Sequence, residues 1–276
     1  MEIKYTILGL LIYLAMAAWL GAFASYAAVA GSGRTGGAGR IPGRVGGALF
    51  AAGFVALLAA VVVRWTEVGH VPMQNMFEVF LCLGMLMFPL WLACWRFLGA
   101  TGPATNVLVG LVVLAPAGFI FEAAPQVLPP ALQSWLFLPH VGAYLVAYVI
   151  LALAGAQAVV QLAWHFSGRA AEAAACELAT HRMILLGFPL LTLGLVLGAI
   201  WGKLAWGDYW NWDPKELWSL ATFLIYLAYL HVRGLHGSRH SLLNAALAMA
   251  GVLAIVITLL WVNLGRMFPG LHSYAN

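Results

Sequence analysis

The chain has 276 residues, of which 64% are hydrophobic and only 8% are charged, and its formal net charge is +4. Soluble domains carry about 25% charged residues, so this composition excludes a soluble globular protein. The apolar residues form continuous runs rather than an alternating pattern, and a helix crosses a bilayer with about 20 such residues. We therefore predict an all-α fold, a polytopic transmembrane helical bundle.

Eight apolar segments follow one another along the chain, and breaks rich in glycine, proline or charge separate them. The first apolar run is too long for a cleaved signal peptide, so we interpret it as a retained span. Residues 31–40 are predicted to form a basic, flexible loop and residues 167–182 a charged loop. The predicted spans are 5–29, 46–64, 73–97, 104–121, 139–166, 183–203, 216–235 and 242–264.

The distribution of charge predicts the orientation, because lysine and arginine gather in loops on the inner side of a membrane. With the N-terminus outside, eight basic and two acidic residues lie inside, for a net charge of +6. Five basic residues, Arg64 among them, and seven acidic residues then lie outside, for a net charge of −2. Both termini are predicted to be outside. The isoelectric point near 9.1 follows from this pattern and gives no support for nucleic-acid binding.

The three cysteines exclude two kinds of redox chemistry. Cys82, Cys94 and Cys176 form no Cys-x-x-Cys pair. The chain therefore has neither a dithiol centre for disulfide reduction nor a Cys-x-x-Cys-His site for covalent haem attachment.

Residues 206–218 contain four tryptophans within thirteen positions, between two apolar segments. Aromatic residues also anchor ordinary membrane proteins at the interface. Asp213, Pro214 and Glu216 fit the start of a helix as N-cap, first and third residues, so capping is one explanation for them. Capping does not explain the tryptophans that precede the helix. We interpret the segment as an aromatic platform for a large, flat, hydrophobic ligand; its tryptophans are Trp206, Trp210, Trp212 and Trp218.

Two histidines, His140 and His272, are candidate ligands of a porphyrin iron, which takes two axial nitrogen ligands. His140 begins the fifth predicted span and His272 follows the eighth, so both lie on the side of the tryptophan segment. His231 lies about fifteen residues into the seventh span, in the inner half of the membrane, where an ionisable group is a functional candidate. A neutral histidine bonded to a neighbouring helix is the alternative for His231.

The segment Trp-Gly-Asp-Tyr-Trp-Asn-Trp-Asp-Pro-Lys-Glu-Leu-Trp at 206–218 resembles the tryptophan-rich WWD motif of haem-handling proteins in cytochrome c biogenesis. His231-x-Arg233, the terminal Gly-Leu-His-Ser-Tyr and Asn75-x-x-Glu78 are similar to the CcsA/ResC branch of System II. The resemblance runs from about residue 70 to the C-terminus. We therefore predict a cytochrome c assembly domain at 70–276, preceded at 1–69 by two transmembrane helices and a basic inner loop.

The resemblance implies a haem-handling subunit of a cytochrome c synthase in the bacterial cytoplasmic membrane, with its functional loop on the periplasmic face. It implies that His140 and His272 are the axial ligands of haem b and that His231 is a ligand of an inner haem site. It implies that the aromatic platform includes Asp213 together with the four tryptophans.

The partner implied by the resemblance is a ResB/CcsB-like membrane subunit, which supplies the second ligand of the inner site. Haem lyase activity is expected only in that complex. The substrate is an apocytochrome c with a Cys-x-x-Cys-His segment, whose thiols other proteins keep reduced. Two alternatives stay open: a CcmC-like haem delivery subunit, which has fewer spans, and a HemX-like non-enzymatic protein of tetrapyrrole metabolism.

Overall fold

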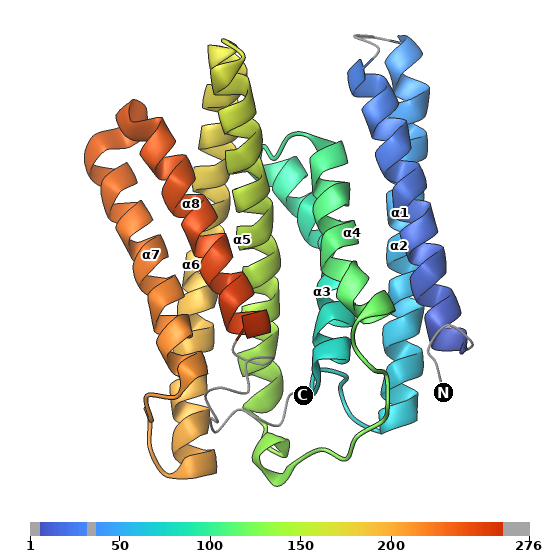
Figure 1. The fold of residues 1–276 in the computed structure, drawn as a ribbon, viewed down its shortest axis with the longest axis vertical. Coiled ribbons are helices and arrows are strands. Elements are labelled where there is room, and N and C mark those ends of the chain that lie inside the picture. The colour runs from blue at the N-terminus through green and yellow to red at the C-terminus, as the bar shows by residue number, and fades with distance from the viewer. Residues whose placement is uncertain (1–5, 32–36, 262–276) are drawn as a thin grey trace. The chain divides into compact units, whose positions relative to one another are not determined.

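The computed structural model describes residues 6–31 and 37–261, and these form helices without any strand (Figure 1). The predicted all-α fold is therefore confirmed. The α-helices are α1 (Ile7–Gly31), α2 (Gly37–Val68), α3 (Met76–Ala93), α4 (Pro103–Phe119), α5 (Phe137–Phe166), α6 (Ala170–Trp206), α7 (Pro214–His236) and α8 (Ser241–Val256).

Six helical stretches are long and apolar enough to cross a membrane. The last of them, Pro214–Leu260, contains both α7 and α8, which are joined by the short 3-10 helix Gly237–His240 and pack against each other (Figure 1). Helix α4 is apolar but has only 17 residues. The chain is thus a multi-pass membrane protein, and each of the eight predicted segments overlaps one of these helices.

The predicted loop at 167–182 is wrong, because α6 begins at Ala170 and continues for 37 residues. Its first turns contain five alanines, the residue with the highest helix propensity. Cys176 is consequently buried in a helix, and the half-buried His181 lies with its ring centroid 6.1 Å from that of Tyr229. The predicted loop at 31–40 is likewise shortened, since α2 begins at Gly37.

The chain divides into two compact units. The first comprises residues 1–91 and 102–127, and in it α1 packs against α2 and α4. Trp19 of α1 is fully buried and donates from Nε1 to the carbonyl of Phe50, 3.1 Å away. A Cβ at Gly53 would lie 2.2 Å from that nitrogen, so this position of α2 requires glycine.

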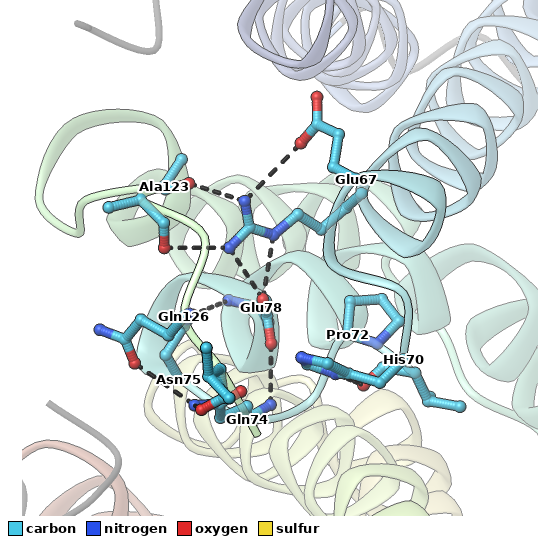
Figure 2. A network of polar contacts seen from close by, with 12 residues as sticks. Glu67, His70, Pro72, Gln74, Asn75, Glu78, Ala123 and Gln126 are labelled. Atoms are coloured by element: carbon cyan, nitrogen blue, oxygen red, sulfur yellow. Dashed lines mark hydrogen bonds and ion pairs between the residues drawn. The ribbon is translucent and has the colours of Figure 1, made fainter. Parts of the chain in front are cut away.

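A buried ion pair joins α2 to α3 in the same unit (Figure 2). The guanidinium of Arg64 is fully buried, and its Nε and Nη2 both lie 2.9 Å from Oε1 of Glu78. Its remaining donors bond to the carbonyls of Ala123 (2.6 Å) and Ala124 (3.3 Å), in the segment that follows α4. Arg64 therefore ties three parts of the chain together.

The other carboxylate oxygen of Glu78 accepts from the backbone N–H of Gln74, 2.8 Å away (Figure 2). Asn75 accepts in turn from the N–H of Glu78 at 3.0 Å and so caps the start of α3. The Asn75-x-x-Glu78 motif thus has a structural explanation: one residue caps the helix and the other neutralises the buried Arg64.

The second unit comprises residues 92–101 and 128–276, and in its described part α5 packs against α6 and α8. A second ion pair lies between α6 and α7, with Glu177 buried and Arg233 half-buried. Nε of Arg233 is 2.6 Å from Oε1 of Glu177, and Asn244 of α8 donates to the same oxygen at 3.2 Å. This contact fixes the rotation of α7 about its axis relative to α6 and α8.

Candidate functional site

Four aromatic rings form a row at the end of the second unit where α5 begins and α6 ends. The imidazole of His140 lies between Tyr144, with a centroid distance of 5.2 Å, and Trp201, with a centroid distance of 5.6 Å and an interplanar angle of 31°. Trp201 in turn contacts Trp206, 5.0 Å away. The row thus connects the predicted ligand His140 to the first tryptophan of the 206–218 segment.

His140 is held by the backbone of α6. Its Nδ1 lies 2.8 Å from the carbonyl oxygen of Gly194, and because a carbonyl only accepts, Nδ1 carries the proton. In this tautomer Nε2 carries the lone pair, and a histidine that binds a metal through Nε2 needs this tautomer. One turn further on, a Cβ at Gly198 would lie 2.6 Å from Cε1 of His140, so the imidazole sits where only glycine leaves room.

Trp201 is a site residue that the sequence analysis missed. It is buried, and its Nε1 donates to the carbonyl of Ala131 at 2.9 Å, which ties α6 to the segment before α5. In the sequence it is one apolar residue inside a long apolar span, so nothing in the composition separates it from the core. Its position five residues before Trp206 was the available indication.

The tryptophan segment leaves α6 at Gly207, whose φ of 93° is left-handed. Trp210 and Trp212 then meet edge to face, with centroids 6.1 Å apart and planes at 87°. Trp212 is 68% exposed and has a φ of 57°. Among the described residues it is the only non-glycine with positive φ, a conformation that costs energy for any residue with a Cβ.

The predicted helix start is confirmed. Asp213 is the N-cap of α7 and accepts from the N–H of Lys215 at 2.9 Å, and Pro214 is the first helical residue. The carboxylate of Glu216 accepts from the N–H of Asp213 at 3.2 Å, which completes a capping box. Asp213 therefore has a structural role.

The structure does not bring every predicted residue to this place. Trp218 is half-buried in the first turns of α7 and makes no ring contact with the other tryptophans in the described part of the chain. His231 lies seventeen residues further along α7 than Pro214, or about 26 Å along the helix axis. His272 lies outside the described residues.

His231 is exposed, and its Nδ1 lies 2.9 Å from the carbonyl oxygen of Leu227 on its own helix. That carbonyl accepts the Nδ1 proton, so Nε2 again carries the lone pair. The described residues contain no group of three or more His, Cys, Asp or Glu side chains able to hold a metal ion.

The sequence profile of the family described as "Cytochrome C assembly protein" matches residues 47–269. The chain is 32% identical to "Cytochrome c biogenesis protein CcsA" of Synechococcus sp. (strain CC9311) over 82% of its own length and 86% of the relative's. It is 33% identical to the protein of that name from Mesostigma viride, covering 83% of this chain and 84% of the relative. For the CcsA of Chlamydomonas reinhardtii, identity is 32% and the coverages are 79% and 65%.

Among solved structures the fold is similar to "Cytochrome c Heme Lyase CcmF", with a TM-score of 0.67 and 23% identity. The match covers 92% of this chain but only 49% of CcmF, so the chain spans about half of that protein. At this identity the likeness concerns the fold alone. The profile match and the identities over most of the chain show that this protein belongs to the cytochrome c assembly family.

Proposed function

We propose that this protein is the haem-handling membrane subunit of a System II cytochrome c synthase, which presents haem b at the outer membrane face for thioether attachment to an apocytochrome c. The observation that carries the proposal is the setting of His140. Its proton is held by Gly194, its lone pair is on Nε2, and an aromatic row leads from it to Trp206. The family membership supplies the chemical context.

The residues present fit a haem. His140 has the tautomer that iron requires, and Gly198 leaves room for its ring. His140 and His272 would be the axial ligands, and the platform would be Trp206, Trp210, Trp212, Asp213 and Trp218. When bound, haem supplies the iron that takes these ligands and the vinyl groups to which cysteine thiols add. The protein's own residues bind, orient and shield the ring, since indole faces pack against flat apolar surfaces and exclude water.

His231 would serve an inner haem site shared with a ResB/CcsB-like partner. It lies on one side of α7 with Leu224 and Leu235, which are both exposed. A polar imidazole on an apolar face toward lipid is unfavourable unless something covers it. Arg233, two residues on, points to the opposite side of α7 and pairs with Glu177. In the His231-x-Arg233 motif, Arg233 thus holds α7 against α6, and His231 faces outward.

The proposed topology has eight spans with both termini on the outer side of the bacterial cytoplasmic membrane. It rests on the positive charge of the inner loops and on helices in all eight predicted segments. In this orientation the His140 row and the tryptophan segment face the periplasm. A reporter-fusion map with six spans would favour the CcmC-like alternative instead.

The proposed function is tested by purifying the protein with and without a co-expressed ResB-like partner and recording oxidised, reduced and pyridine haemochrome spectra. We expect a b-type spectrum with paired axial histidines, and maturation of a co-expressed cytochrome c only when the partner is present. Colourless protein in both preparations would favour the HemX-like alternative. Haem binding without maturation in the presence of the partner would favour haem delivery.

Replacing His231 with alanine should reduce haem loading several-fold while leaving the outer site intact, because the lone pair that receives incoming haem is lost. Added imidazole should restore loading more readily than it does for an outer ligand, because no thiol chemistry depends on the position of this ligand. The measurement is haem per folded protein in the complex, with Leu235→Ala as the control on the same exposed side of α7. Full haem and normal maturation in His231→Ala protein would make His231 a surface histidine only.

A further inference from the structure

Trp212 combines a left-handed backbone with a ring that is largely exposed. Glycine adopts positive φ at no steric cost, whereas a residue with a Cβ keeps it only when surrounding contacts impose it. A tryptophan usually buries more apolar surface than most residues, and here Trp212 remains 68% exposed. Both features are unfavourable in the protein alone, so surrounding contacts must maintain them.

A single carboxylate oxygen brackets Trp212. Oε2 of Glu216 accepts from the N–H of Asn211 at 2.7 Å and from the N–H of Asp213 at 3.2 Å. These two amides belong to the residues on either side of Trp212, so one acceptor fixes both flanks of the left-handed residue. Hydrogen bonds to a charged acceptor are roughly twice as strong as neutral ones.

Helix capping accounts for only one of these bonds. In a capping box the third helical residue reaches back to the N–H of the N-cap, which here is Asp213. The bond to Asn211, two residues earlier and shorter by 0.5 Å, is additional to that motif. Asp213 meanwhile caps the helix by accepting from the N–H of Lys215 at 2.9 Å.

We infer that Glu216 is a positioning residue that holds Trp212 in its left-handed conformation, with the indole turned outward to meet a flat aromatic ligand. The inference deepens the proposed function and rests on it for the identity of that ligand, a porphyrin. We call the two hydrogen bonds from the N–H groups of Asn211 and Asp213 to Glu216 the Glu216 clamp. The clamp is a property of the haem-free protein, so it is tested without haem as well as with it.

The first test compares Glu216→Ala with Asp213→Ala in haem-free protein. Both variants lose a bond at the start of α7, but only Glu216→Ala releases the Asn211 side of Trp212. Chymotrypsin cleaves after aromatic residues, so cleavage within 209–212 should be at least about fivefold faster in Glu216→Ala and close to wild type in Asp213→Ala. Glu216→Gln keeps an acceptor oxygen and should lie near wild type. Equal cleavage rates in the two alanine variants would overturn the clamp.

The second test measures backbone strain by comparing Trp212→Gly with Trp212→Ala. Both lose the indole, but only glycine adopts a φ of 57° freely. The glycine variant should therefore melt about 2–4 °C above the alanine variant in haem-free protein. An equal or lower melting temperature for the glycine variant would show that Trp212 is not held under strain.

The third test couples the two residues through haem binding. Glu216→Ala should lower haem per folded protein about fivefold in the wild-type background and have no further effect when Trp212 is already glycine. An equal loss in both backgrounds would mean that Glu216 acts elsewhere. If wild-type protein binds no haem, the proposed function fails. The cleavage and melting tests use haem-free protein and would still show whether Glu216 holds Trp212 in its left-handed conformation.

Discussion

A His140→Ala protein is expected to accumulate in the membrane, to retain less than about a tenth of the wild-type haem and to mature no cytochrome c. The physical reason is that the variant removes the Nε2 lone pair, which in the proposed site would bind the haem iron while Nδ1 is bonded to Gly194. The measurement is the optical spectrum per immunoblotted protein, together with haem staining of a reporter cytochrome. Imidazole in the medium should restore part of the haem, since a free ligand can occupy the vacant axial position.

Two glycines, Gly198 on α6 and Gly142 on α5, provide a matched pair of variants. At Gly198 an added Cβ would collide with His140 at 2.6 Å, whereas at Gly142, two residues along α5 from the histidine, it would meet nothing within 4 Å. Gly198→Ala should therefore displace the imidazole of His140 although the histidine is still present, and the protein should lose haem. Gly142→Ala should behave as wild type. Normal haem content and maturation in both His140→Ala and Gly198→Ala proteins would refute the axial-ligand assignment.

Removing the charge of Arg64 is expected to destabilise the first unit by about 3–5 kcal/mol, since breaking a buried ion pair leaves an uncompensated charge. Arg64→Met would leave Glu78 buried without its partner and would leave the carbonyls of Ala123 and Ala124 without donors. The measurement is the thermal or denaturant-induced unfolding of detergent-solubilised protein, with the amount in the membrane as a second readout. We expect a sharp fall in both.

Two variants separate the ion pair from its surroundings. The double variant Arg64→Met/Glu78→Gln removes both charges and keeps an acceptor for Gln74, so it should recover part of the lost stability. Glu67 lies 3.6 Å from Arg64 but is 42% exposed, and Glu67→Gln should change stability by less than about 1 kcal/mol. If the Arg64→Met protein were as stable as the Glu67→Gln protein, the buried ion pair would not stabilise the first unit.

The order and type of the elements were predictable from the sequence, because in a bilayer each backbone amide must bond within its own segment and long apolar runs therefore form helices. The start of α7 was predictable as well. Asp213, Pro214 and Glu216 act within one turn, so their spacing alone determines the cap. The start of α6 was not predicted, because the charged residues of 167–182 are typical of a loop, whereas the alanines among them favour a helix.

The sequence by itself also determined which residue types are candidates at the site: tryptophans in one short segment and histidines at span ends. Only the tertiary structure decided what they do together. Trp201 joins His140 to Trp206 across two helices, and the carbonyl that selects the His140 tautomer belongs to a residue 54 positions away. The sequence places Arg64 among the outer charges, yet it is fully buried, because Glu78 of another helix neutralises its charge. Such contacts depend on which faces of distant helices meet, and no local spacing encodes that.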